Sequence, residues 1–284
     1  MKIRVGLTGW GDHDDLYQDG VPAQKKLERY AEHFSVVEVD SSFYAVQPTR
    51  NYEKWVKETP PDFSFIIKAY QGMTGHLRGK NPFSSSHDMF QAFIESIQPV
   101  AESSKLKAVL FQFPPWFDCT RPNVDALKYI KSKMNEMPLA LEFRHQSWFT
   151  PEMREKTLAF MSKEGWIHSI CDEPQAGADS VPIVLHPTCQ QLTIVRFHGR
   201  NAEGWSQSGN ANWREIRYLY NYSREELAEW ANRMEQIKSR TDEICLLFNN
   251  NSGGHAASNA KEMMGLLGMD YPALPVPPQQ LELF

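Results

Sequence analysis

The sequence predicts an α/β fold, a single (β/α)8 barrel of the TIM type. Eight short β-rich runs alternate with segments of helical spacing along the 284 residues, which favours parallel βαβ units. The runs are apolar on both faces, as SVVEVD, LTIVRF and ICLLF illustrate, and this is typical of barrel strands covered by helices. No Gly-x-Gly-x-x-Gly motif follows the first run and no Gly-Lys-Ser/Thr motif occurs, which counts against an open nucleotide-binding sheet.

The first five strand-helix units follow from apolar runs that are each succeeded by a helical pattern. Pro22 opens the first helix, because the fixed φ of proline suits a first helical turn. The expected strands of this half are residues 3–7, 36–40, 63–68, 108–113 and 139–143. The expected helices are residues 22–33, 52–58, 86–101, 124–134 and 151–163.

The second half contains an irregular sixth crossover. Residues 173–191 carry prolines and a glycine without a helical period, so no helix is expected there. Ser223 to Glu226 has the spacing of a capping box and begins a helix. The expected strands are 166–171, 192–197 and 244–248, and the expected helices are 223–238 and 256–267.

Length and composition bound the domain organisation and the class of protein. A barrel of about 250 residues forms one domain, so residues 1–270 are assigned to the barrel and 271–284 to a Pro-rich linker with a terminal motif. The 30 Lys and Arg against 35 Asp and Glu give a net charge of −5, which argues against extensive binding of duplex DNA. No apolar run reaches membrane length, and a cytoplasmic protein is expected. Four dispersed cysteines without a CxxC pair predict reduced thiols.

Polar residues follow nearly every expected strand, at the end where barrels of this type carry their active sites. Residues two apart on a strand share a face, which pairs Glu38 with Asp40 and Glu142 with Arg144. The same rule groups Arg196 with His198 and Arg200. For any single pair, a buried ion-pair layer without chemistry is an equally good interpretation. The whole rim comprises Thr8, Trp10, Glu38, Asp40, Lys68, Gln112, Glu142, Arg144, Asp172, Arg196, His198, Arg200, Asn249 and Asn250.

Tryptophans lie in the loops that follow the expected strands. Such residues suit a wall that stacks on planar or sugar-like ligands, although a lone loop tryptophan more often packs into the protein. They are Trp10, Trp116, Trp148, Trp205 and Trp213.

Several separated motifs resemble those of the YecE-like family of uncharacterised proteins. They are TGW at 8–10, VEVDSSFY at 37–44, FQFPP at 111–115, LEFRH at 141–145 with Trp148, RFHGR at 196–200 and FNN at 248–250. The resemblance spans residues 3 to 268 and implies a TIM-type barrel without an assigned activity. Family members usually carry Asn where this chain has Asp40, and a Thr-His pair after the third strand appears here as Thr74-Gly75-His76.

The rim predicts an enzyme that uses general acid/base groups on a phosphorylated or otherwise anionic ligand. Glu142 and His198 are the leading acid/base candidates, with Glu38 and Lys68 as further catalytic candidates. Arginine suits bidentate recognition of phosphate or carboxylate. A hydrolase, lyase or isomerase fits this set, and a non-catalytic ligand sensor is the alternative. The expected ligand-binding residues are Thr8, Trp10, Asp40, Gln112, Arg144, Asp172, Arg196, Arg200, Asn249 and Asn250.

A metal is not expected at this rim. Carboxylates with one imidazole would suit magnesium or manganese, but the Arg and Lys side chains at the same rim repel a divalent ion. The alternative ligand set is Glu38, Asp40, Glu142, Asp172 and His198.

The C-terminal residues predict a tethered interaction motif. The proline-rich residues 271–278 form an extended spacer, and the chain ends in QLELF. This ending resembles the pentapeptide by which bacterial replication and repair proteins bind the sliding clamp. Leu283 and Phe284 would enter an apolar pocket of the clamp while Gln280 forms hydrogen bonds, with Leu281 completing the motif. A tail that folds back onto the barrel is the alternative interpretation.

Overall fold

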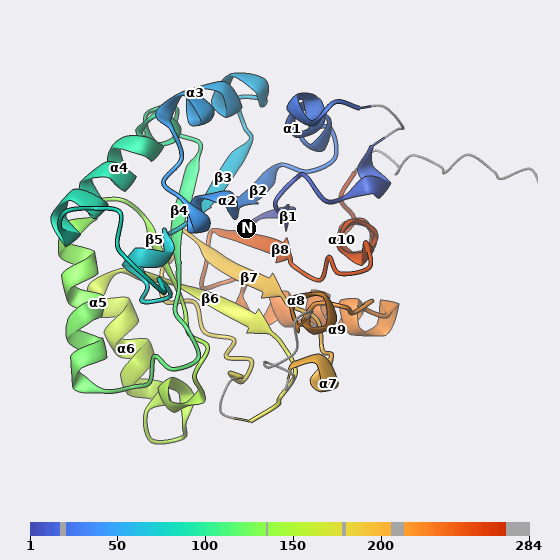
Figure 1. Ribbon diagram of the computed structural model, residues 1–284. Helices are drawn as coiled ribbons and strands as arrows, with labels where there is room; N and C mark the ends of the chain where they lie inside the picture. The colour runs from blue at the N-terminus through green and yellow to red at the C-terminus, as the bar shows by residue number, and fades with distance from the viewer. Residues whose placement is uncertain (18–20, 135, 178–179, 206–212, 271–284) are drawn as a thin grey trace, which may run out of the picture.

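The strands of the molecule form one closed parallel barrel in chain order, which confirms the predicted fold (Figure 1). The computed structural model describes residues 1–17, 21–134, 136–177, 180–205 and 213–270. Each strand pairs in parallel with the next, and β8 closes the barrel against β1. The strands are β1 Lys2–Thr8, β2 Val36–Val39, β3 Ser64–Lys68, β4 Leu106–Gln112, β5 Leu139–Glu142, β6 Trp166–Asp172, β7 Thr193–Phe197 and β8 Glu243–Phe248.

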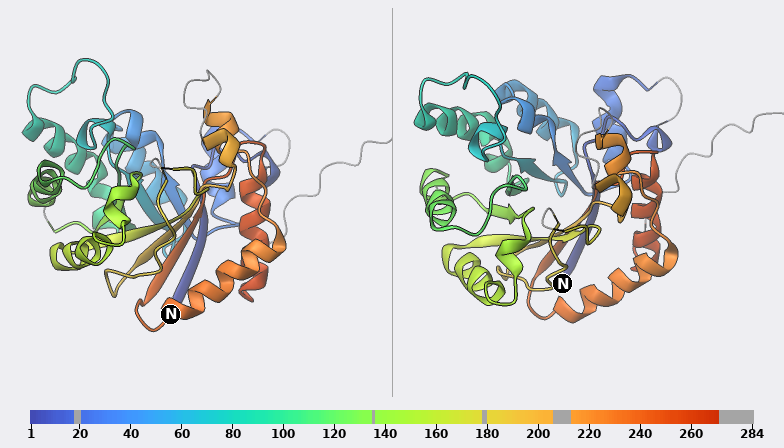
Figure 2. Two further views of the ribbon diagram at one scale, coloured as in Figure 1. Left: turned by 90° about the horizontal axis from the view of Figure 1, so that it is seen from below. Right: turned by 60° about the horizontal axis from the view of Figure 1, so that its bottom comes forward.

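The longer helices lie outside the barrel (Figure 2). They are α3 Thr49–Glu58, α4 Ser86–Glu102, α5 Arg121–Lys133, α6 Arg154–Glu164, α9 Arg224–Ile237 and α10 His255–Leu266. The shorter ones are α1 Lys26–Tyr30, α2 Ser41–Tyr44, α7 Ala202–Trp205 and α8 Trp213–Arg217. The capping box at the start of α9 is present, because Ser223 and Glu226 each bond the other's backbone N–H.

The connections after β1, β2 and β7 differ from the sequence-based prediction, and the one after β7 contains the short α7 and α8 before α9. In place of a helix over 22–33, the described part of the first crossover has the 3-10 turn Ala23–Lys25 and the five-residue α1, after an earlier 3-10 turn, Asp14–Leu16. The hydroxyl of Tyr30, the last residue of α1, lies between β1 and β2, donating to Val36 O at 2.8 Å and accepting from Leu7 N at 2.7 Å. These bonds tie Tyr30 to both strands, and residues 31–33 continue as hydrogen-bonded turns rather than as α-helix. The unexpected α2 follows β2 directly, and its Ser42 hydroxyl donates to Val39 O and Lys68 O.

The sixth crossover is irregular, as predicted. Residues 173–177 and 180–192, the described part of this connection, contain neither helix nor strand. Residues 271–284, with the predicted spacer and clamp-binding motif, lie outside the described residues.

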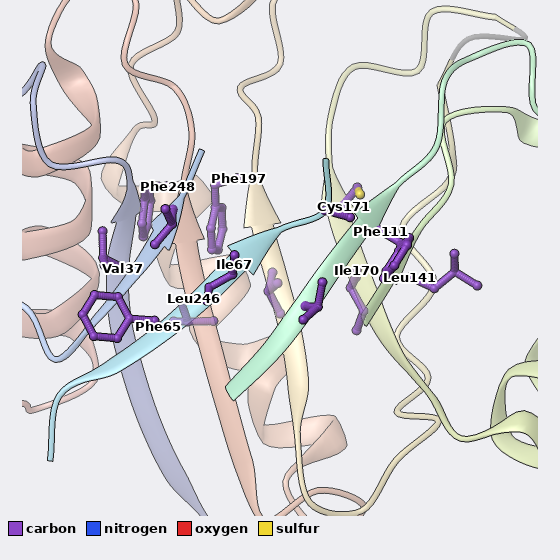
Figure 3. Close-up of a cluster of buried hydrophobic side chains, with 14 of the residues drawn as sticks. Val37, Phe65, Ile67, Phe111, Leu141, Ile170, Cys171, Phe197, Leu246 and Phe248 are labelled. Atoms are coloured by element: carbon purple, nitrogen blue, oxygen red, sulfur yellow. The ribbon is translucent and has the colours of Figure 1, made fainter. Parts of the chain in front are cut away.

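Alternate residues of the strands belong to two separate buried apolar clusters. Val37, Phe65, Phe111, Phe197 and Phe248 belong to the larger cluster, which includes the apolar side chains of the surrounding helices (Figure 3). Burying a side chain of this size stabilises the fold by about 1.5–3 kcal/mol. The neighbouring positions form a smaller cluster inside the barrel, made of Val36, Ile66, Ala108, Leu110, Ala140, Ile167, Leu192, Ile194, Cys245 and Leu247.

The interior of the barrel changes character from its N-terminal to its C-terminal end. At the N-terminal end Glu243 accepts from Arg4 at 2.6 Å and from Lys107 at 2.8 Å. A hollow of about 400 Å³ opens there, lined in part by Lys107 and Lys131. The smaller apolar cluster fills the middle of the barrel. The charged residues predicted at the rim therefore lie next to this apolar cluster, at the end where barrels of this type carry their catalytic groups.

No helix of the described residues is long and apolar enough to cross a membrane. The four cysteines are free thiols: Cys171 and Cys245 are buried, and Cys119 and Cys189 are half-buried.

Candidate active site at the C-terminal end of the barrel

Arg196 lies at the centre of a buried layer of charged side chains, called the charged layer below. It binds two carboxylates. Its Nε and Nη2 donate to Glu38 at 2.9 and 2.7 Å, and its Nη1 donates to Glu142 at 2.7 Å. All three side chains are at most 1% exposed. The two carboxylates raise the pKa of the guanidinium, so Arg196 is a permanent cation. Charges buried in this way persist only when they are paired and hydrogen-bonded, and here they are.

Glu142, at the end of β5, is saturated with donors. Besides Arg196, it accepts from Gln112 Nε2 at 2.7 Å and from Ser169 Oγ at 3.2 Å, and Arg144 lies 3.3 Å away. Although burial opposes ionisation, the charges of Arg196 and Arg144 and the contact with His198 hold the pKa of Glu142 well below its usual value. Glu142 is therefore a fixed anion at neutral pH.

His198 is a buried, neutral imidazole. Its Nε2 lies 3.2 Å from Glu142 Oε1, and its Nδ1 lies 3.0 Å from Asn249 Nδ2. Burial lowers the pKa of His198 to about 3, against the opposing effect of Glu142. Both contacts are satisfied by the tautomer that donates from Nε2 to Glu142 and accepts from Asn249 at Nδ1.

Lys68 and Asp40 form an ion pair that reaches solvent. Lys68 Nζ lies 2.9 Å from Asp40 Oδ1 and 4.7 Å from the centre of the Phe43 ring. Asp40 and Glu38 raise the pKa of Lys68 against the effect of burial, so its ammonium is charged. Asp40 does not continue β2 beside Glu38, as alternation predicts, because the backbone turns there into α2 with φ −83° and ψ −26°.

Glu173 is a site residue that the sequence-based prediction missed. It follows β6, is 2% exposed, accepts from Val181 N at 2.7 Å and lies 2.9 Å from Arg144 Nη1. Burial raises the pKa of Glu173 to about 7, although Arg144 opposes the shift. Strand alternation could have identified it, because Ser169 also faces Glu142 and Glu173 lies four residues further along the chain.

Asp172 and Arg200 lie outside this layer, against α9. Asp172 accepts from Trp230 Nε1 at 2.7 Å and from Arg200 Nε at 2.9 Å. Arg200 also lies 3.0 Å from Glu226 of α9. The predicted grouping of Arg200 with Arg196 and His198 is wrong, because Gly199 takes a left-handed backbone, φ 86°, and ends the alternation.

The two asparagines after β8 separate in the same way. Asn249 contacts His198, whereas Asn250 donates to Tyr220 O at 2.9 Å and to Asn259 Oδ1 of α10 at 2.8 Å. The contacts of Asn250 thus join the loop to the helix layer rather than to the charged layer.

A half-buried floor borders the fully buried layer, since Thr8 pairs in register with Glu38 and Gln112 with Glu142. Thr8 belongs to this floor, and its Oγ1 is buried without a hydrogen-bond partner among the described residues. Trp10, two residues after Thr8, packs edge-on against Trp55, with ring centres 4.9 Å apart. The half-buried polar side chains of the floor are Thr8, Asp40, Lys68, Gln112 and Asn249.

His76 is a second residue missing from the predicted site. Its Nδ1 lies 2.8 Å from Thr74 Oγ1, and its ring contacts those of Phe43 and Trp116. Burial, with the charges of Lys68 and Arg144, lowers the pKa of His76 to about 4. The Thr74-Gly75-His76 sequence was the available signal for this residue.

The other loop tryptophans divide between packing and the rim. Trp148 is buried and stacks on Phe143 at 4.0 Å between ring centres. Trp205 is buried, with the guanidinium groups of Arg144 and Arg217 at 4.7 and 3.6 Å from its ring. Trp116 is 55% exposed. The side chain of Trp213 lies outside the described residues.

Each cation predicted to bind an anion is already paired. Lys68 contacts Asp40, Arg144 contacts Glu173, Arg196 contacts Glu38, and Arg200 contacts Asp172. The predicted rim is thus close to electrically neutral rather than strongly cationic.

A metal ion fits these residues poorly. Glu142, Cys171 and His198 place one possible ligand atom each within 4.8 Å of one another. However, Glu142 is occupied by Arg196, and burial raises the pKa of the Cys171 thiol well above its usual value. The carboxylates predicted for magnesium or manganese do not converge, because Asp172 faces α9 and Arg196 occupies Glu38.

Comparisons with known proteins agree with this barrel fold. Residues 4–282 match the family described as "Protein of unknown function DUF72". The chain is 56% identical to the UPF0759 protein YunF of Bacillus subtilis (strain 168) over 283 residues, which are 99% of this chain and 100% of that protein. It is 26% identical to the UPF0759 protein YecE of Escherichia coli (strain K12) over 156 residues, 55% of this chain and 53% of that protein.

Solved structures of similar proteins share the fold. A crystal structure of a DUF72 family protein (EF0366) from Enterococcus faecalis V583 has a TM-score of 0.89 and 36% identity, covering 97% of this chain and 98% of that one. A crystal structure of a DUF72 family protein (TM1631) from Thermotoga maritima MSB8 has a TM-score of 0.79 and 29% identity, covering 94% and 100% respectively.

Proposed function

Because the chain belongs to the DUF72 family of proteins of unknown function, we propose its activity from the chemistry of the site: acid/base catalysis on a small polar ligand at the C-terminal end of the barrel. The predicted resemblance to YecE-like proteins is confirmed by this membership. A hydrolase, lyase or isomerase fits the proposal, since each of these reactions needs a group that gives or takes a proton.

The observation that carries the proposal is a pair of buried carboxylates whose environments separate their pKa values. The pKa of Glu142 lies well below its usual value, while that of Glu173 is raised to about 7. Arg144 lies 3.3 Å from the first and 2.9 Å from the second. When two carboxylates at one site have pKa values separated in this way, one acts as a fixed anion and the other as a proton carrier.

We therefore assign roles to Glu173 and to two residues of the predicted set. Glu173 exchanges the proton, because its pKa is close to neutral pH. Glu142 stays ionised and orients Arg196 and His198. His198 is neutral at physiological pH and acts as a hydrogen-bonding group rather than as the acid or base predicted from the sequence.

The ligand is expected to meet the half-buried floor first. Lys68 is the cation of this floor, and Asp40 neutralises it. An anionic group, as predicted from the sequence, would therefore have to compete with Asp40 for Lys68. This balance favours a polar ligand with little or no net charge.

A metabolite screen tests the proposal. The full chain is incubated with a cell extract, and consumed and formed compounds are identified by mass spectrometry. Glu173→Gln and His198→Gln are expected to lose conversion at least tenfold while keeping the circular-dichroism spectrum of the wild type. Glu226→Gln, in the cluster against α9, is the matched control and should convert normally. Full conversion by both site variants would refute the assignment, and a bound but unconverted compound would favour a sensor.

A second candidate function is association with DNA metabolism through the sliding clamp. The observation behind it is the C-terminal QLELF sequence, preceded by the Pro-rich residues 271–278. A peptide of residues 277–284 titrated against purified bacterial clamp tests it, with Leu283→Ala/Phe284→Ala as the matched peptide. Saturable binding by the first peptide alone is expected. Equal, weak binding by both would exclude this partner.

A further inference from the structure

An aromatic wall borders one side of the half-buried floor. The Trp116 ring lies 5.9 Å from the ring of His76, which lies 5.1 Å from the Phe43 ring. The Phe43 ring in turn lies 4.7 Å from Lys68 Nζ. Trp116, from the loop after β4, is thus connected by direct contacts to the polar floor.

The exposure of this wall needs an explanation. Five large hydrophobic side chains of the described residues are strongly exposed, and two of them, Trp116 and Tyr44, lie at this edge beside Phe43 and His76. Isolated exposed hydrophobic residues are ordinary, but exposed aromatic residues beside an active site are typical of ligand contacts. The guanidinium of Arg78 lies 5.6 Å from the Trp116 ring, and Trp116 is nevertheless 55% exposed.

The floor offers hydrogen bonds without a net charge. Thr8 supplies a hydroxyl, Gln112 and Asn249 supply amides, and Asp40 and Lys68 neutralise each other. The Oγ1 atom of Thr8 is buried and has no hydrogen-bond partner among the described residues, which costs about 1–3 kcal/mol unless a ligand or water satisfies it. Closely spaced hydroxyls on the ligand would match these donors and acceptors.

We propose that the ligand is a neutral carbohydrate, a monosaccharide or disaccharide, whose ring stacks on Trp116 and whose hydroxyls bond the floor. The C–H groups on one face of a sugar ring carry partial positive charge and suit the negative face of an indole. The inference rests on the proposed function for the location of the site and adds the class of substrate.

Ligand-observed saturation-transfer NMR tests the proposal on the full chain. The probes are free hexoses, pentoses and simple disaccharides, with glucose 6-phosphate as the anionic arm and adenine as the planar arm without hydroxyls. At least one neutral sugar is expected to receive saturation. Trp116→Ala should reduce this signal at least fivefold, whereas Tyr129→Ala, 44% exposed on α5, should leave it unchanged.

A second variant separates binding from folding. Thr8→Val keeps the shape of the side chain and removes a hydroxyl that has no partner, so the free energy of unfolding should not fall. The sugar signal should nevertheless fall several-fold. Equal signals in the wild type, Trp116→Ala and Thr8→Val would overturn the proposal. So would the absence of a signal from every neutral sugar, or binding of glucose 6-phosphate or adenine alone.

The two proposals fail in different ways. A sugar that binds through Trp116 but is never converted would refute catalysis and support the ligand class. Conversion of a compound without hydroxyls, lost in Glu173→Gln, would support catalysis and refute the ligand class.

Discussion

Arg196 and Glu38 are joined by two parallel hydrogen bonds inside the barrel, although 158 residues separate them in the sequence. Because the same guanidinium also binds Glu142, two buried carboxylates carried by β2 and β5 share one cation. The pairing links β2, β5 and β7 across the barrel interior, at the layer beneath the proposed site.

Replacing Arg196 by methionine should destabilise the fold strongly. Arg196→Met leaves Glu38 and Glu142 buried without their shared cation, and breaking a buried pair costs about 3–5 kcal/mol. Urea denaturation at pH 7 measures the free energy of unfolding. The loss should shrink as the pH falls, because protonated carboxyls need no cation.

An exposed arginine provides the matched control. Arg121 pairs with Asp125 on the surface of α5, and Arg121→Met should leave the urea midpoint unchanged. Equal midpoints for the two methionine variants would contradict the structural role assigned to Arg196.

Glu173 should make the stability depend on pH near neutrality. Its pKa is about 7 in the folded protein, above the usual value of a glutamate, so the folded state holds its proton more tightly than the unfolded state. The contribution of Glu173 to stability is therefore present below the unfolded pKa and is lost as the pH rises through 7. The full change is about 3 kcal/mol by proton linkage. Arg144, Arg217 and Glu142 are the charged groups that act on Glu173.

Glu173→Gln isolates this effect, because glutamine cannot ionise. The difference in unfolding free energy between the variant and the wild type should shift in favour of the variant between pH 5 and pH 8, measured by urea denaturation. A difference that stays constant over this range would mean that Glu173 does not titrate there.

The fold was predictable because the strands of a barrel have a recognisable pattern of apolar residues. Runs such as residues 244–248 are apolar on both faces, since one face meets the barrel interior and the other meets helices. The short α1 was not predictable from periodicity. After α1 the chain continues in hydrogen-bonded turns rather than in α-helix, and the tertiary bonds of the Tyr30 hydroxyl to β1 and β2 leave no local signal in the sequence.

The site residues were predicted correctly where the strands are regular, and the prediction failed where the strands end. Arg196 and His198 share a face as alternation requires. At the end of β6, the prediction assigned Asp172, the last acid of the strand, to the site. Asp172 instead faces α9, and its neighbour Glu173 contacts the charged layer. A one-residue error in phase exchanges the two faces of a strand, and neither charge nor composition corrects it.

Removing the Asp172 carboxylate should weaken the fold but spare the site. Asp172→Ala takes away the acceptor of Trp230 and the partner of Arg200, which should cost about 2–4 kcal/mol. Conversion per folded molecule in the metabolite assay should match that of the wild type at a temperature well below the melting transition. Loss of conversion by the folded variant would return Asp172 to the active site.

Chelation should change neither stability nor conversion. The ligand atoms of Glu142, Cys171 and His198 are close together, but Arg196 lies 2.7 Å from the carboxylate and burial raises the pKa of the thiol, so binding a divalent ion would require displacing a cation and ionising Cys171. A metal that binds only the folded state raises the melting temperature with its concentration. Thermal melts with added zinc, magnesium or manganese should therefore show no saturable rise, and elemental analysis of protein purified without chelator should find no stoichiometric metal. A saturable rise that disappears in Cys171→Ser would instead establish a metal site at these three residues.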